Sequence, residues 1–164
     1  MRYIILLIVV MCGGWLLWQK GDTIPGYASD YGNAAYVIEG TRVQLVDGAA
    51  ESDGVITQEF GNEVTGDMSG DGIADVAFIL AQQPGGTGTF YYIAVARGFE
   101  SGYVGTNALL LGDRIAPQTT ELRDGVIIVN YADRKPGEPM TADPSVGVSR
   151  MFRIENNVLK EVSR

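Results

Sequence analysis

The sequence predicts a mainly β protein, a small antiparallel sandwich or barrel of about seven to nine strands, preceded by one N-terminal transmembrane helix. Three observations lead to this prediction. From residue 35 onward, short runs of β-branched and aromatic residues alternate with turn-forming residues. After position 20, no window of about 12 residues has apolar residues at helical spacing. The run from Tyr3 to Trp18 contains no charged residue.

The uncharged run Tyr3–Trp18 is the candidate membrane segment. As an α-helix it would span roughly 24 Å, slightly less than the apolar core of a bilayer. We expect residues 1–20 to be a retained anchor in the cytoplasmic membrane. One alternative is a signal peptide cleaved near residues 26–28, which would release a secreted protein, and another is a lipoprotein modified at Cys12. Arg2 favours a cytoplasmic N-terminus, so the bulk of the chain would lie on the periplasmic or extracellular side.

Residues 21–34 are rich in Gly, Asp and Ser and predict a linker, which leaves 35–164 as the exported β domain. Within this domain, Arg42–Val46 alternates between apolar and polar residues, as a half-buried strand does. Val55–Phe60 is the second candidate strand, and Asp75–Ala81 is apolar on both faces, as a central strand would be.

The later strands are predicted from the same kinds of residue pattern. Phe90–Ala96 has the aromatic and β-branched content of a strand, and the Gly-rich segment 84–88 before it predicts a hairpin turn. In 146–154, the apolar residues Val146, Val148, Phe152 and Ile154 share one face, and Asn156-Asn157 predicts a hairpin turn into the last strand. Strands are also expected at 107–111, 126–131 and 158–162, with a long exposed loop at 132–145.

Composition excludes several classes of function. The chain has 12 basic and 20 acidic residues, so it lacks the basic footprint of a nucleic-acid-binding protein. It contains no His and one Cys, which excludes Ser-His-Asp and Cys-His catalysis and an intrachain disulfide. Between Arg42 and Arg97 there are eight acidic residues and no basic one, a pattern typical of a solvated face or of a negative surface that favours cations.

One short segment, residues 67–75, has the residue spacing of a metal-binding loop. Its side-chain oxygens fall at loop positions 1, 3, 5 and 9, supplied by Asp67, Ser69, Asp71 and Asp75. Gly72 falls at position 6, where a sharp turn brings in the backbone carbonyl of Ile73 as a further ligand. This spacing predicts a structural Ca²⁺ site formed by these five residues; an empty β-turn rich in Gly and Asp is the alternative.

The loop departs from an EF-hand, because position 12 is Phe78 and no helix pattern flanks it. Phe60-Gly61 followed by 66–76 (GDMSGDGIADV) instead resembles the calcium loop of FG-GAP repeats, the blades of integrin-α-type propellers. Ser69 replaces the usual Asn or Asp of that loop. A propeller needs at least four blades, and the chain holds one match, so the propeller fold is not implied.

A wider resemblance extends over most of residues 33–162. Five segments follow one another in the order seen in a group of exported bacterial proteins of unknown function: GDMSGDGIADVAFIL, GGTGTFYYIAV, LLGDRI, DGVIIVNY and KPGEPM. The proteins of that group share GDxNGDGxxD, GGSGTFYY and LGDR segments. The resemblance implies an envelope protein and carries no activity or partner with it.

The remaining polar signals favour structure over catalysis. Asp113-Arg114 predicts an ion pair or a turn, and Tyr91, Tyr92 and Tyr103 predict packing in the core or on a sheet face. We therefore expect a membrane-tethered binding or envelope-associated module with a protein or glycan partner, and no enzymatic activity. The alternative is a small hydrolase of the envelope, acting through carboxylates such as Glu59 and Glu63 or through metal-activated water at the 67–75 loop.

Overall fold

The structure is a computed structural model that describes residues 26–163, and it confirms the mainly β architecture. This part of the chain forms one short 3₁₀ helix and twelve strands, more than the sequence predicted. The elements are η1 (Tyr31–Asn33), β1 (Ala35–Ile38), β2 (Thr41–Gln44), β3 (Ala49–Ser52), β4 (Val55–Gly66), β5 (Asp75–Gln83), β6 (Phe90–Phe99), β7 (Gly102–Gly105), β8 (Asn107–Asp113), β9 (Ala116–Arg123), β10 (Val126–Asp133), β11 (Val146–Glu155) and β12 (Val158–Val162).

Four of these strands, β1, β3, β7 and β9, lie outside the predicted segments. For three of them the reason is visible in the sequence: AAES and GYVG are short and rich in small residues, and APQTTELR is polar and includes a proline. Such segments have little intrinsic strand preference and become strands by pairing with a neighbour. Conversely, the predicted turns at 84–88 and Asn156-Asn157 are confirmed, because β5 pairs with β6 around the first and β11 with β12 around the second.

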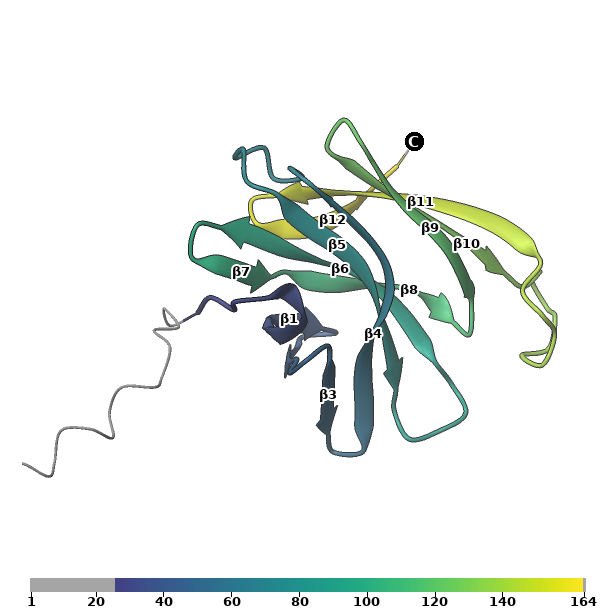
Figure 1. The fold of residues 1–164 in the computed structure, drawn as a ribbon. Helices are drawn as coiled ribbons and strands as arrows, with labels where there is room; N and C mark the ends of the chain where they lie inside the picture. Colours follow the sequence, from purple (N-terminus) through teal and green to yellow (C-terminus); the bar gives the residue numbers. More distant parts are fainter. Residues whose placement is uncertain (1–25, 164) are drawn as a thin grey trace, which may run out of the picture.

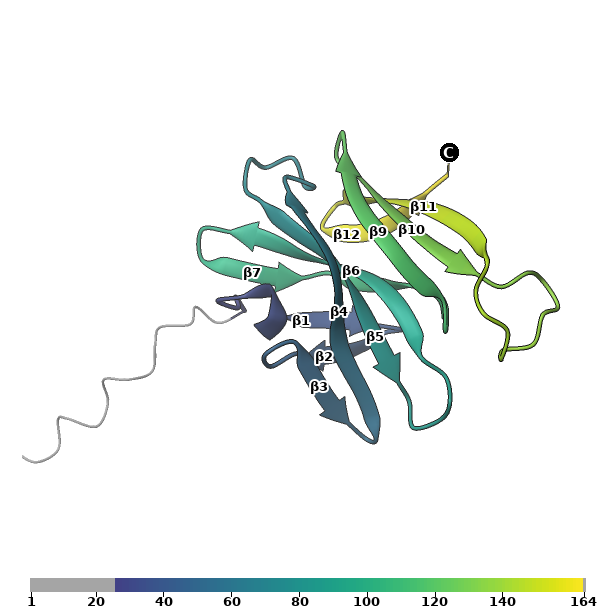
Figure 2. The same cartoon turned by 45° about the vertical axis from the view of Figure 1, so that its right-hand side comes forward.

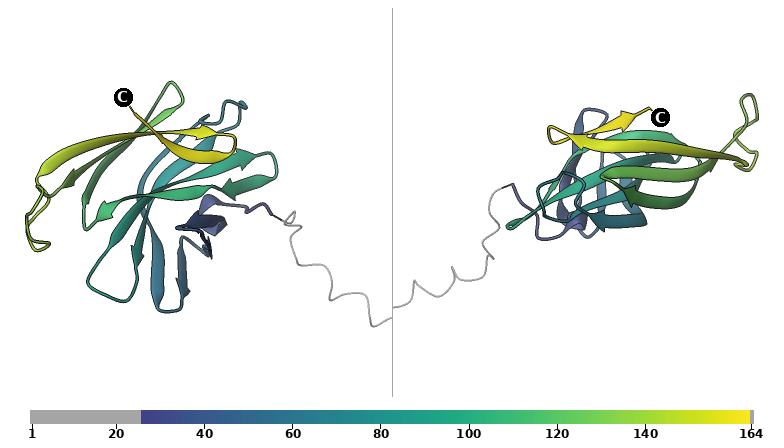
Figure 3. Two further views of the ribbon diagram at one scale, coloured as in Figure 1. Left: turned by 180° about the vertical axis from the view of Figure 1, so that it is seen from behind. Right: turned by 90° about the horizontal axis from the view of Figure 1, so that it is seen from above.

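The strands form two sheets. The large sheet has the order β2-β1-β8-β6-β5-β4-β3, with β7 added beside the far end of β6. The C-terminal sheet has the order β12-β11-β10-β9. The described strand pairs are antiparallel except β1 with β8, which is parallel. Figure 1 shows the C-terminal sheet at the upper right of the large sheet, and the views from behind and above in Figure 3 show it as a layer of its own.

Two hydrophobic cores lie on opposite faces of the large sheet. The first fills the space between the sheets and includes Ile79, Ile93, Val129 and Phe152. The second lies inside the curl that the large sheet makes with its edge strands, and it includes Tyr36, Phe78, Leu80 and Tyr92. Strand β5 contributes to both cores, which confirms the prediction that its apolar run is buried on both faces.

Two of the side-chain contacts between the sheets involve β12 and β9, the edge strands of the C-terminal sheet. The Asn107 amide on β8 pairs with the backbone of β12, donating to the Leu159 carbonyl at 3.0 Å and accepting from the Leu159 N–H at 2.8 Å. At the other edge, Leu122 of β9 packs on Gly66 of β4 so closely that a Cβ on Gly66 would lie 2.5 Å from the Leu122 Cδ2 atom. These contacts connect both edge strands of the C-terminal sheet to the large sheet.

The end of the predicted linker packs against the domain. Ala28 forms a β-bridge with Tyr103, the Tyr31 ring packs on Phe78, and Gly32 is buried. Apolar and aromatic residues in this stretch explain the packing, because they bury surface against the second core. The predicted membrane anchor at residues 1–20 lies outside the described residues. No helix within residues 26–163 has the length and apolar character needed to cross a bilayer.

Candidate functional site

The predicted calcium loop connects β4 to β5 as an irregular turn stabilised by its own carboxylates. Asp67 accepts hydrogen bonds from the N–H groups of Gly70 at 2.6 Å, Asp71 at 3.2 Å and Gly72 at 2.9 Å. Gly70 and Gly72 have φ values of +80° and +86°, the left-handed region in which glycine is favoured. The predicted role of Gly72 in a sharp turn is therefore confirmed.

Asp75, the last predicted ligand, is the buried centre of this region. Its side chain is completely enclosed, and its oxygens accept hydrogen bonds from the N–H groups of Met68, Ser69 and Gly98, each at 2.9 Å. The Gly98 bond fastens the loop to β6. A Cβ on Gly98 would lie 2.1 Å from the Ala74 carbonyl oxygen, so this close approach requires glycine.

Asp71 is paired with a positively charged side chain of the same protein, Arg97. One of its oxygens accepts a hydrogen bond from the Ile73 N–H, and the other forms an ion pair with Arg97 of β6 at 2.8 Å. These contacts, the backbone bond first, lower the pKa of Asp71 below its usual value. Arg97 also hydrogen-bonds to Asn157 in the β11–β12 turn and lies over the Phe99 ring, so it ties the loop to both sheets.

The loop as arranged fits N–H donors better than a calcium ion. Calcium needs six to eight oxygens directed at one centre, whereas Asp71 and Asp75 direct their oxygens at backbone N–H groups and Arg97. Of the other three expected ligands, Asp67 accepts hydrogen bonds from loop N–H groups, Ser69 has a buried hydroxyl without a hydrogen-bond partner, and Ile73 donates its N–H to Asp71. Among residues 26–163, no group of three or more acidic, His or Cys side chains is placed to hold a metal ion. Calcium binding by these five residues stays a prediction, and it requires Asp71 to leave Arg97.

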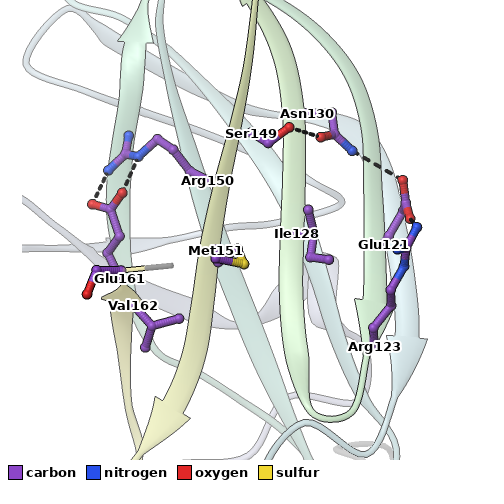
Figure 4. Close-up of a pocket in the computed structure, with 10 residues that line it drawn as sticks. Glu121, Arg123, Ile128, Asn130, Ser149, Arg150, Met151, Glu161 and Val162 are labelled. Atoms are coloured by element: carbon purple, nitrogen blue, oxygen red, sulfur yellow. Dashed lines mark hydrogen bonds and ion pairs between the residues drawn. The ribbon is translucent and has the colours of Figure 1, made fainter.

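A second candidate site lies on the outer face of the C-terminal sheet. This face forms a hollow of about 370 Å³ between β9 and β12. Its centre is apolar and consists of Ile128, Met151 and Val162, which are neighbours in the strand register and are half-buried. Figure 4 shows these three side chains between two polar groups, one on each side.

The polar groups around the hollow are bonded to one another. On one side, Ser149 donates to the side-chain oxygen of Asn130 at 2.6 Å, the Asn130 amide donates to Glu121 at 3.2 Å, and Glu121 forms an ion pair with Arg123 (Figure 4). On the other side, at the sheet edge, Arg150 and Glu161 form two parallel hydrogen bonds of 2.7 Å each. This pair lies toward the large sheet, where Arg150 also donates to the Leu110 carbonyl of β8 at 2.6 Å. The Arg150 guanidinium holds the pKa of the Glu161 carboxyl below its usual value.

Other predicted polar residues have structural contacts. Asp113 and Arg114 form the expected ion pair at 2.9 Å, and Asp113 also accepts a hydrogen bond from the Thr89 N–H. Glu59 accepts a hydrogen bond from the Tyr31 hydroxyl at 3.0 Å. Tyr92 is buried in the second core, as expected for a core tyrosine.

Sequence reasoning missed Arg97 as the partner of Asp71 and missed the hollow around Met151. Alternation along the last strands predicts which residues face outward, but it does not predict that the sheet curves into a hollow. No family model, no curated protein and no solved structure matches the chain.

Proposed function

We propose that this chain is a membrane-tethered binding module that recognises a protein partner through the outer hollow of its C-terminal sheet and performs no catalysis. The observation that carries the proposal is the pattern on that face: an apolar centre of Ile128, Met151 and Val162 bordered by hydrogen-bonded polar side chains. Protein interfaces have this arrangement, with an apolar core, a polar rim and an enrichment in Met and Arg.

The bonding among these polar side chains supports binding over chemistry. A catalytic acid or base needs a proton-accepting or proton-donating atom directed at a substrate. Here the Glu121 and Glu161 carboxylates are directed at Arg123 and Arg150. Polar groups that already have partners cost less free energy to cover with another protein than unpaired ones do.

The tether rests on the sequence. The uncharged run of residues 3–18 has the length and composition of a short membrane anchor, and Arg2 favours an orientation with the domain outside. In this proposal the loop at 67–75 has a structural role: it holds β4, β5 and β6 together through Asp75.

The hydrolase alternative has weaker support. It would use the carboxylates of the 67–75 loop or of β4. Asp75 is completely enclosed, and Glu59 is hydrogen-bonded to Tyr31, so neither is directed at open space.

Position-dependent crosslinking in native membranes tests the proposal on the full chain. A photo-crosslinking amino acid in place of Met151 should give a discrete protein adduct, and the same amino acid in place of Gln58, an exposed residue of β4, should not. Ile128→Glu should remove the adduct while leaving the circular dichroism spectrum unchanged. Identical adducts from both positions, or an adduct that survives Ile128→Glu, would overturn the proposal.

A further inference from the structure

A second cavity lies at the open end of the large sheet, on a different part of the molecule from the hollow described above. Strands β2 and β3 are the two ends of the large sheet in strand order, and a short turn at residues 45–48 connects them. From this turn the two strands diverge and leave a cavity of about 610 Å³ between them. Figure 2 shows β1, β2 and β3 gathered at this end of the molecule.

The lining of this cavity is mixed: four of its residues are apolar, and the other nine are polar or charged. Val43 of β2 and Ala50 of β3 line it and pack against the second core, and Val55 adds a further apolar side chain. Thr57 also lines it and is only 2% exposed; its hydroxyl accepts a hydrogen bond from the Gln82 amide at 3.1 Å. A cavity that combines apolar side chains with polar groups, between the end strands of a curled sheet, has features of a small-molecule site.

The rim of the cavity is acidic. Glu39, Glu51 and Asp53 lie on it with one basic residue, Arg42, and none of the four takes part in an ion pair within residues 26–163. The surrounding chain has the same sign, because residues 26–100 contain eleven acidic and two basic side chains. A surface of this charge raises the local concentration of cations and lowers that of anions.

The Tyr92 hydroxyl joins the rim to the core. It donates a hydrogen bond to the Glu39 carboxylate at 3.2 Å, and the Tyr92 ring is buried. Glu39 lies in the turn between β1 and β2 with a φ of 48°. This bond holds one carboxylate at the boundary between the apolar side chains of the cavity and the solvent, where a ligand's charged group would lie.

We propose that this cavity binds a small amphipathic cation, a molecule with an aliphatic or aromatic body and a protonated amine. The body lies against Val43, Ala50 and Val55, where it replaces water on apolar surface. The ammonium group lies at the rim near Glu39 and Glu51 and stays partly hydrated, which avoids the cost of burying a charge.

The test uses three phenylalkyl probes that differ in charge: 4-phenylbutylammonium, 4-phenylbutanol and 4-phenylbutyrate. Binding to the full chain is measured by titration calorimetry and by methyl NMR. We expect the cation to bind with a Kd at least about threefold lower than the anion, the size of effect that exposed charges produce. The methyl signals of Ile38, Val43 and Val55 should shift, and that of Ile128 on the other sheet should not.

Two matched tryptophan variants locate the site. Ala50→Trp fills the cavity from β3 and should abolish cation binding, whereas Ala49→Trp, at the exposed neighbouring position, should leave it unchanged. Glu39→Gln combined with Glu51→Gln should remove the preference for the cation over the anion. If Ala50→Trp does not fold, the methyl shifts alone test whether the cation binds in this cavity. Absence of binding at millimolar probe, equal binding of cation and anion, or full binding to a folded Ala50→Trp protein would overturn the proposal.

Discussion

Removal of the Asp75 carboxylate is the perturbation that most directly tests how the 67–75 loop is built. Asp75 accepts three backbone hydrogen bonds at 2.9 Å from a fully buried position. Two of the donors belong to the loop and the third, Gly98, belongs to β6. In Asp75→Ala, all three N–H groups lose their acceptor.

The magnitude follows from the three bonds. A hydrogen bond to a charged group contributes about 1.5 kcal/mol or more to stability, so Asp75→Ala should lower the free energy of unfolding by about 4 kcal/mol. Asp75→Asn keeps one accepting oxygen and should cost about 2 kcal/mol, because its new N–H₂ group faces a backbone donor. Asp143→Ala, at an exposed loop position, is the matched control and should change stability by less than about 0.5 kcal/mol.

Urea unfolding of the full chain, followed by far-UV circular dichroism, measures all three variants. A loss of about 4 kcal/mol is a large part of the 5–15 kcal/mol that usually stabilises a domain. A free energy of unfolding of Asp75→Ala within about 1 kcal/mol of the wild type would contradict this role of the carboxylate, as would an Asp75→Asn protein less stable than Asp75→Ala.

Three further predictions concern other contacts. Asn107→Leu removes both amide bonds to β12 and should cost about 2 kcal/mol and speed hydrogen exchange of the Leu159 amide; unchanged exchange would contradict the role of this contact. If the loop binds calcium, the ion would compete with Arg97 for Asp71, so millimolar Ca²⁺ should raise the thermal midpoint of Arg97→Gln more than that of the wild type, with Mg²⁺ and EDTA as controls. A larger response of the wild type, or no response in either protein, would count against the predicted site. Burial, together with Glu39, raises the pKa of Tyr92 to about 12, whereas its ordinary pKa in the unfolded chain is 10. The protonated Tyr92 hydroxyl therefore stabilises the fold below pH 10, and this contribution is lost between pH 10 and 12. Unfolding measured at pH 8 to 12 should therefore decline less steeply in Tyr92→Phe than in the wild type, and equal slopes would refute the assignment.

Alternation and composition predicted eight of the strands, because these strands carry strongly apolar or aromatic residues that must be buried. The run at 75–81 is the clearest case, since a segment that is apolar on both faces can only lie between two cores. The short strands β3 and β7 carry no such signal, because their backbone pairing, rather than their side chains, places them in the sheet.

The chemistry of the 67–75 loop shows where sequence reasoning reached its limit. The spacing of Asp67, Asp71 and Asp75 correctly indicated that the carboxylates belong to one tight loop with Gly72 at its turn. The spacing alone does not specify what neutralises them. Arg97 is 26 residues away from Asp71 in sequence and reaches it only because β5 and β6 pair as a hairpin.

By itself, the sequence determined the fold class, the buried central strands, the two hairpin turns and the acidic character of residues 26–100, because each depends on side chains that are near one another along the chain. The tertiary structure alone decided which groups meet across the chain: Arg97 with Asp71, Asn107 with Leu159, and β2 with β3 around a cavity. These contacts depend on the curl of the large sheet and on the placement of the second sheet against it. Those features are set by the packing of the two cores as a whole, and no local pattern of residues specifies them.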